Sequence, residues 1–129
     1  MGVPSYSVLV ADDDPSCREA VRALLEKEGF RTETAESGAH ALRKFERELF
    51  HLVILDQTMP ELTGIETLKR LAEIDGRVPS ILMSGEATER TRAEALDAGA
   101  FTFISKPIQT AIMRSAVQQV IDRYYSKLR

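Results

Sequence analysis

The chain has 129 residues, of which 43% are hydrophobic and 29% charged, and its formal net charge is −3. This length fits one domain, and the composition is that of a globular protein rather than a disordered or collagen-like one. The longest wholly apolar runs, such as residues 52–55, are far shorter than the roughly 20 residues that cross a bilayer. The negative charge argues against nucleic-acid binding by this domain, and we expect no membrane association.

Cysteine usage indicates the compartment. The only cysteine, Cys17, cannot form an intrachain disulfide, and the N-terminus lacks the features of a signal peptide. We therefore expect a reducing, cytoplasmic setting. Cys17 lies near the expected start of a helix, which can lower the pKa of a thiol, but without a second cysteine a redox role is not favoured. His40 and His51 are too far apart to suggest a metal pair and are expected at the surface.

The first half of the chain alternates strand and helix twice. An apolar strand is predicted at residues 6–11, and Asp14 before Pro15 indicates the cap and first turn of a helix. The next strand, 31–35, is polar and alternating, which is typical of an edge strand. A second helical pattern precedes another apolar strand at residues 52–55.

The second half continues the same alternation. Thr63 and Glu66 form a capping-box pattern that predicts the start of a third helix. Further apolar strands are predicted at residues 80–83 and 101–104, with a helix between them and a final helix from about 108 to 128. The residues expected to form apolar faces on these last two helices are Ala95, Leu96, Ile112, Ala116, Val120 and Tyr124.

The alternation of strands and helices predicts the fold class. Crossover units of this length imply a parallel sheet, and mostly apolar strands imply that helices cover both of its faces. An edge position for residues 31–35 fits the order 2-1-3-4-5. The prediction is an α/β, flavodoxin-like, doubly wound five-stranded parallel sheet. We expect a single domain over residues 1–129, with a core at about 6–125 and the start of a linker at 126–129.

Polar residues follow the strands that border the crevice of such a sheet. They are Asp12 and Asp13 after the first strand, Asp56 after the third, Ser84 after the fourth, and Lys106 with Pro107 after the fifth. A single Asp at a strand end is often only a cap, but three carboxylates together repel one another and call for a cation or an ammonium group nearby. Ligands that offer only oxygen favour Mg²⁺ over Zn²⁺, and Lys106 offers a compact positive charge for a phosphoryl oxygen.

Taken together, these motifs resemble those of the receiver domains of two-component response regulators, the CheY-like family. The resemblance rests on Asp12-Asp13, Asp56-Gln57-Thr58-Met59-Pro60, Gly64, Ser84-Gly85 and Lys106-Pro107. From Asp13 the successive separations to Asp56, Ser84 and Lys106 are 43, 28 and 22 residues. The resemblance covers nearly the whole chain, from about Tyr6 to the final helix.

The resemblance implies a phosphorylation-dependent signalling switch that uses Mg²⁺. Asp56 would accept a phosphoryl group from a phosphohistidine. Asp13, Asp56 and the backbone carbonyl of Thr58 would ligate the metal, and Asp12 would act mostly through a bound water. Lys106 would pair with the phosphoryl group.

The same resemblance implies how the signal would be read. Ser84 would offer its hydroxyl to a phosphoryl oxygen and draw its loop inward, and Phe103 would rotate into the space that the loop leaves. Phe103 stands where many receivers have Tyr, so packing alone would make that switch. The face formed by the fourth helix, the fifth strand and the fifth helix would change. The Lys106–Pro107 bond is expected to be cis.

The implied partners are a sensor histidine kinase or phosphotransfer protein and a downstream effector protein or domain, with a homodimer as a further way to read the signal. The chain would promote its own phosphorylation and dephosphorylation without being a turnover enzyme. Two forms remain open: a stand-alone receiver, and a piece of a larger regulator or hybrid kinase.

Other functions fit the residues less well. A phosphatase of the haloacid-dehalogenase type needs a second acid two residues after its nucleophile, where this chain has Thr58. A pseudo-receiver usually lacks the acidic pair, the acceptor or the lysine, all of which are present. Dinucleotide binding would need a glycine-rich run after the first strand, and Asp12 and Asp13 stand there instead.

Overall fold

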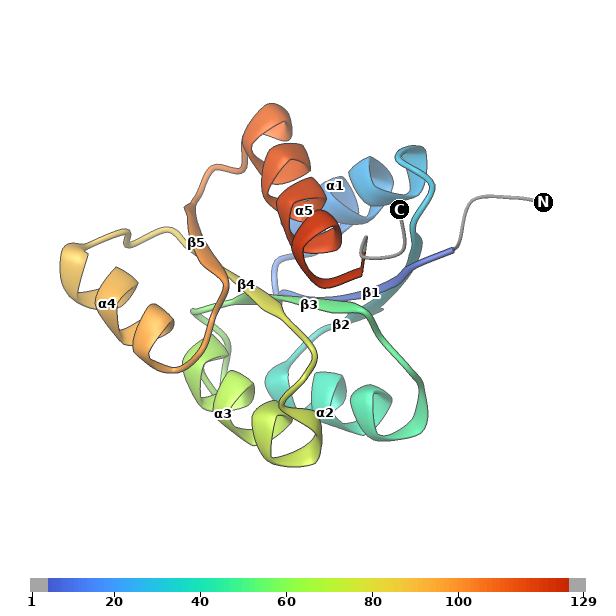
Figure 1. The fold of residues 1–129 in the computed structure, drawn as a ribbon. Coiled ribbons are helices and arrows are strands. Elements are labelled where there is room, and N and C mark those ends of the chain that lie inside the picture. The colour runs from blue at the N-terminus through green and yellow to red at the C-terminus, as the bar shows by residue number, and fades with distance from the viewer. Residues whose placement is uncertain (1–4, 126–129) are drawn as a thin grey trace.

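A computed structural model describes residues 5–125 of the chain. Five parallel strands form one sheet in the order β2-β1-β3-β4-β5, which confirms the predicted topology. The strands are β1 (Ser7–Ala11), β2 (Arg31–Ala35), β3 (Leu52–Asp56), β4 (Ser80–Ser84) and β5 (Thr102–Ser105). Figure 1 shows them at the centre of the molecule, between two layers of helices.

The helices cover both faces of the sheet, as the apolar strands predict. They are α1 (Pro15–Lys27), α2 (Gly38–Arg47), α3 (Gly64–Asp75), α4 (Glu89–Asp97) and α5 (Thr110–Tyr125). Helices α1 and α5 lie on one face, α2 and α3 on the other, and α4 lies beside β5 (Figure 1). The alternation of side chains along each strand separates two cores. In β1, for example, Val8 and Val10 join the core beneath α1 and α5, and Leu9 joins the other.

Helix starts are fixed by the residues that the sequence indicates. The Asp14 carboxylate accepts a hydrogen bond from the backbone N–H of Ser16 at the start of α1. At the start of α3, Thr63 and Glu66 form the complete capping box. Each cap satisfies a backbone N–H that has no partner within its helix. None of the helices in residues 5–125 combines the length and apolar character that a membrane span needs.

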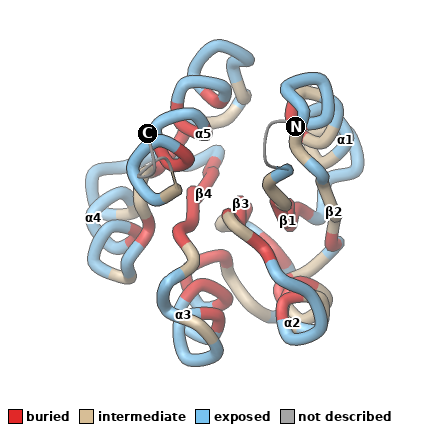
Figure 2. The backbone as a smooth tube through the Cα atoms, turned by 45° about the vertical axis from the view of Figure 1, so that its right-hand side comes forward, coloured by how far each residue is buried: buried red, intermediate tan, exposed pale blue. Residues whose placement is uncertain are grey.

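Burial is greatest in the central strands and lowest at the outer helices (Figure 2). Every residue of β3 and β4 is buried, whereas β2 is mostly half-exposed, as expected for an edge strand. Three apolar residues predicted on helix faces are exposed instead: Leu96, Ile112 and Tyr124. Because α4 and α5 lie on either side of the edge strand β5, each buries only a narrow stripe. In α5 that stripe contains Met113, Ala116, Val117, Val120 and Ile121.

The structure differs from the sequence prediction at the end of the final helix and at His51. The final helix was expected to span about 108–128, and α5 is Thr110–Tyr125 in the described residues; the predicted linker start at 126–129 lies outside them. His51 is not a surface residue but is half-buried. Its Nδ1 accepts a hydrogen bond from the backbone N–H of Ser7 at 2.9 Å, and its ring packs edge-on against Tyr6 and Tyr125.

Candidate functional site

The carboxyl ends of β1, β3, β4 and β5 bring the predicted site residues to one edge of the sheet. Asp56 is the last residue of β3 and Ser84 the last of β4, while Asp12 and Lys106 directly follow β1 and β5. Because the strands are parallel and in register, these ends lie side by side. The structure therefore assembles the crevice from segments far apart in the sequence.

A buried ion-pair triad lies at the centre of this crevice. The Lys106 Nζ donates a hydrogen bond to Asp12 Oδ2 at 3.0 Å and forms an ion pair with Asp56 Oδ1 at 3.1 Å. The side chains of Asp12 and Asp56 are 0% and 4% exposed. Buried charges cost free energy unless they are paired and hydrogen-bonded, so Lys106 stabilises both carboxylates together. The Lys106–Pro107 peptide bond is cis, as predicted.

The two buried carboxylates differ in their pKa values. Burial raises the pKa of Asp56 to about 6, with the charge of Asp12 adding to the effect and the contact with Lys106 opposing it. Burial also acts to raise the pKa of Asp12, but hydrogen bonds from Cys17, the backbone N–H of Asp14 and Lys106 hold it below the ordinary value. Burial acts to lower the pKa of Lys106, yet the two acids raise it well above its usual range.

A third carboxylate, that of Asp13, completes an oxygen-rich cluster. One oxygen each from Asp12, Asp13 and Asp56 can be chosen so that all lie within 4.8 Å of one another. Lys106 pairs with Asp12 and Asp56 but not with Asp13, which is exposed. Three acids against one ammonium leave excess negative charge, and hard oxygen donors are what Mg²⁺ prefers. The residues present therefore fit a divalent cation. Thr58 lies in the exposed loop after β3, and its carbonyl ligand stays a prediction.

Hydrogen bonds from the starts of α1 and α3 fix the backbone at and beside the two buried acids. The side chain of Gln57 accepts from the backbone N–H of Ile65 at 2.9 Å, and its carbonyl accepts from Gly64 at 3.0 Å. This ties the start of α3 to the end of β3. On the other side, Arg18 donates to the carbonyl oxygen of Asp12 at 2.8 Å.

Sequence reasoning did not predict the contacts of Arg18 or Cys17. Burial and a hydrogen bond to Asp12 raise the pKa of the Cys17 thiol to about 12. A thiol that stays protonated is a poor nucleophile, so its place here is structural. The positions of Cys17 and Arg18 in the first turn of α1, shortly after Asp12 and Asp13, are the only feature of the sequence that could have indicated these contacts.

The predicted switch residues lie around the crevice, and the carbonyl oxygen of Ser84 accepts a hydrogen bond from the backbone N–H of Lys106 at 2.8 Å. Ser84 is buried, and its Oγ accepts from the backbone N–H of Glu86 at 3.0 Å. The Ser84 hydroxyl is thus hydrogen-bonded within the loop that follows β4. Phe103 is only 4% exposed and packs in the core with Met59 and Leu82. The predicted rotation of Phe103 into a vacated space stays a prediction, because the ring is already buried here.

Comparisons with known proteins agree on one family. The model for the response regulator receiver domain matches residues 8–118. Response regulator RR06 of Streptococcus pneumoniae is 33% identical over 119 residues, which cover 92% of this chain but 54% of RR06, so the chain spans about half the length of that relative. The chemotaxis protein CheY of Bacillus subtilis is also 33% identical, covering 92% of this chain and 99% of CheY. The CheX–CheY–BeF3–Mg²⁺ complex of Borrelia burgdorferi matches with a TM-score of 0.86 and 31% identity, covering 90% of this chain and 89% of that chain.

Proposed function

The chain belongs to the response regulator receiver domain family of two-component signalling, and from this premise we propose that it is a switch phosphorylated on Asp56. One observation carries the proposal. Asp56 ends β3 with its carboxylate beside Lys106 Nζ at 3.1 Å and within the cluster formed with Asp12 and Asp13. It therefore offers a nucleophilic oxygen where positive charge can be concentrated.

The cluster that includes Asp13 supports binding of Mg²⁺ by Asp13, Asp56 and the carbonyl of Thr58, with Asp12 acting mostly through a water. When bound, Mg²⁺ would neutralise charge that builds up between the carboxylate and the phosphoryl oxygens. A CheY relative has been solved with both BeF3 and Mg²⁺, which supports the same ligand chemistry for this chain.

The phosphoryl transfer would proceed by attack of an Asp56 carboxylate oxygen on the phosphorus of a phosphohistidine. The new P–O bond forms as the P–N bond to the imidazole breaks, and the imidazole nitrogen leaves with its electron pair and takes up a proton. Lys106 would move its ion pairing from the carboxylate to the phosphoryl oxygens. Catalysis of this kind consists of positioning and electrostatic stabilisation. The chain would promote this step and also its own dephosphorylation, in which water attacks the phosphorus, the Asp56 carboxylate leaves and inorganic phosphate is released, without acting as a turnover enzyme.

The switch would then run through Ser84 and Phe103. The Ser84 hydroxyl would exchange its contact with Glu86 for a phosphoryl oxygen, drawing the loop before α4 inward. Phe103 would then rotate into the space that the loop leaves. The face formed by α4, β5 and α5 would carry the change to a partner, as a local charge event biases a two-state element.

The family implies a sensor histidine kinase or phosphotransfer protein as donor and an effector protein or domain as target, with a homodimer as the alternative. Direct nucleic-acid binding by this domain is not proposed, because its formal net charge is −3. A cytoplasmic location is part of the proposal and rests on the single cysteine of the sequence.

The test is phosphorylation by acetyl phosphate in the presence of Mg²⁺, followed by intact-protein mass spectrometry. The expected result is one added phosphoryl group that is labile to base and hydroxylamine. Asp56→Asn keeps the side-chain volume and should abolish the adduct. Asp14→Asn is the matched control, because it removes a carboxylate two residues from Asp12 and Asn still caps a helix well. A stable adduct on Asp56→Asn, or labelling unaffected by excess chelator, would contradict the proposal.

A further inference from the structure

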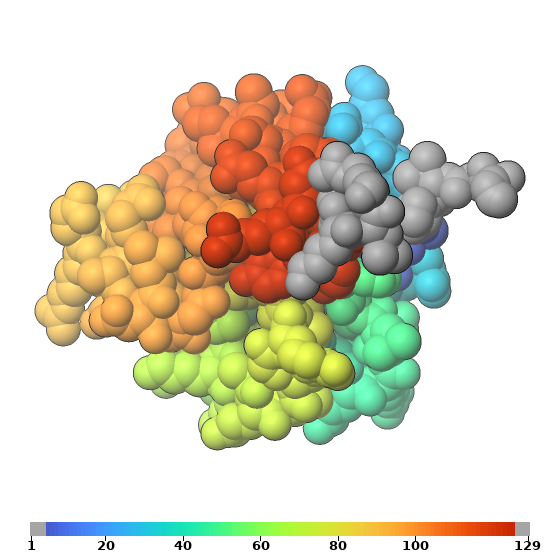
Figure 3. Space-filling model, viewed as in Figure 1, coloured from blue at the N-terminus to red at the C-terminus, as the bar shows by residue number. Residues whose placement is uncertain are grey.

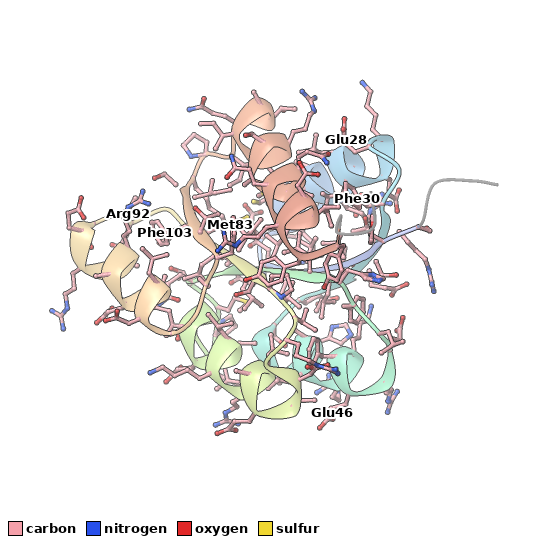
Figure 4. All side chains as sticks on the ribbon, viewed as in Figure 1. Glu28, Phe30, Glu46, Met83, Arg92 and Phe103 are labelled. Atoms are coloured by element: carbon pink, nitrogen blue, oxygen red, sulfur yellow. The ribbon has the colours of Figure 1, made fainter. Side chains whose placement is uncertain are left out.

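An arginine on α4 covers the ring of Phe103. The guanidinium carbon of Arg92 lies 5.2 Å from the centroid of that ring, which is within the range of a cation–π interaction. Figure 4 shows the two side chains near each other, one on α4 and the other on β5. The contact therefore joins two elements of the face that the proposed switch would change.

Among the described residues, the ring of Phe103 is the interaction partner of the Arg92 side chain. Within residues 5–125, no carboxylate lies within ion-pairing distance of its guanidinium, whereas Arg90, also on α4, pairs with Glu94 at 3.5 Å. The positions one turn away from Arg92 on the helix are Thr88, Glu89, Ala95 and Leu96. Of these only Glu89 is an acid, and no ion pair joins it to Arg92 in the described residues. The guanidinium of Arg92 thus contacts the ring and forms no ion pair within residues 5–125.

The two sides of Phe103 differ in chemistry. The ring belongs to the core cluster that contains Met59, Leu82 and Ala95, while the exposed Arg92 lies over it from α4. A ring that left this position would lose both its apolar contacts and the cation. In the space-filling view α4 forms an edge of the molecule, in gold, so its outer face is open to a partner (Figure 3).

We propose that Arg92 is a positioning residue that holds the ring of Phe103 in its buried conformation and thereby couples α4 to β5. Exposed cation–π pairs shift an equilibrium by a factor of about two to five, which is enough to bias a two-state element without fixing it. The proposal rests on the proposed function only where it concerns the response to phosphorylation. The position of the ring in the unmodified protein can be tested separately.

The first experiment measures the ring in the metal-free protein. A single para-fluorophenylalanine at position 103 reports ring burial through its fluorine chemical shift and its solvent isotope shift. Arg92→Met keeps the length of the side chain and removes the charge, and we expect it to raise the exposed-ring population by about two- to five-fold. Arg92→Lys should retain most of the wild-type population. Arg90→Met is the matched control, because it removes the same charge from the same helix without touching the ring, and it should change nothing.

Fluorination of the ring separates the cation–π effect from packing. Adding fluorines weakens the negative face of the ring, so successive fluorination at position 103 should raise the exposed population step by step when Arg92 is present. The same series in Arg92→Met should be flat. Equal slopes in the two backgrounds, or a ring population unchanged by Arg92→Met, would overturn the proposal.

The second experiment measures coupling to the site with beryllofluoride and Mg²⁺. If the phosphorylated form needs a buried ring, Arg92→Met should weaken beryllofluoride binding by about two- to five-fold, by linkage, and Arg90→Met should not. If wild type binds no beryllofluoride, the proposed function fails while the fluorine measurement still decides the role of Arg92. If wild type binds it and Arg92→Met binds equally well, the coupling is wrong.

Discussion

The electrostatic balance of the site depends on which acid lacks a partner. Lys106 pairs with Asp12 and Asp56 and makes their burial tolerable, whereas Asp13 adds a third negative charge without an ammonium of its own. Repulsion from Asp13 therefore weakens the metal-free fold, and a bound cation would remove that cost. Residues that favour the ligand thus lower the stability of the protein without it.

This balance predicts that Asp13→Ala stabilises the metal-free protein. Removing one of three clustered charges should raise the free energy of unfolding by about 1 kcal/mol, or a few degrees in Tm. The same change should abolish Mg²⁺ binding, because the remaining acids are already paired with Lys106. Thermal melts with chelator and a Mg²⁺ titration measure the two effects.

Asp12→Ala is the informative comparison. It also removes one negative charge, but it leaves Lys106 with one buried partner instead of two and so should lower Tm. If Asp13→Ala melts below wild type in metal-free buffer, repulsion is not the dominant effect at Asp13.

At the scale of helices and strands, patterns predicted the elements well and their outer faces less well. The polar alternation of β2 predicted its bounds correctly, Arg31–Ala35. An edge strand is partly exposed, so its polar side chains alternate visibly with the others along the sequence. The ends of β3 and β4 were one residue too short, since the polar Asp56 and Ser84 still belong to the ladder. Leu96 was expected on a buried face but lies 46% exposed, because spacing does not reveal how much of a helix a sheet edge can cover.

The site was predictable for the same reason that the sheet was. Parallel strands place their carboxyl ends together, so Asp12, Asp56 and Lys106 could be placed in one crevice from the strand order alone. The bond between Ser84 and Glu86 and the contact of Arg92 with Phe103 could not be predicted. Both depend on side-chain rotamers and on the distance between elements, which no sequence period encodes.

The junction of β3 and α3 depends on a glycine with no room for a side chain. A Cβ on Gly64 would lie 2.5 Å from the carbonyl oxygen of Asp56 and 2.9 Å from the Cα of Gln57. Both neighbours are backbone atoms, so relief requires α3 to move away from the strand. We expect Gly64→Ala to cost about 1–3 kcal/mol of unfolding free energy. Because Asp56 would shift with its strand end, Mg²⁺ binding should weaken as well.

Gly85→Ala is the control for this prediction. A Cβ there would meet no atom within 4 Å, and the residue does not have a positive φ. Urea denaturation should therefore leave Gly85→Ala close to wild type while Gly64→Ala unfolds earlier. Equal midpoints for Gly64→Ala and wild type would show that the junction can relax without cost.

At the scale of the whole molecule, aromatic rings pack together at the amino ends of the central strands, opposite the site, and two of them come from the two ends of the described chain. Tyr6 precedes β1, His51 precedes β3 and Tyr125 ends α5, and their rings pack against one another with centroids 5.1–5.6 Å apart. The Tyr125 hydroxyl donates to the carbonyl oxygen of His51 at 2.7 Å, across 74 residues of sequence. This cluster anchors the end of α5 to the central strands.

The anchor predicts a measurable cost for removing one hydroxyl. Tyr125→Phe keeps the ring contacts and deletes the hydrogen bond, so it should lower the free energy of unfolding by about 0.5–1.5 kcal/mol. Amide hydrogen exchange should rise in the last turn of α5 but not at Asp56, because the anchor lies at the amino ends of the strands and the site at their carboxyl ends. Tyr124→Phe is the matched control, since within residues 5–125 the Tyr124 hydroxyl makes no hydrogen bond and the ring's edge-on contact with Phe101 survives the change. Should both variants show the same stability and exchange as wild type, the hydrogen bond from Tyr125 to His51 does not help to anchor α5.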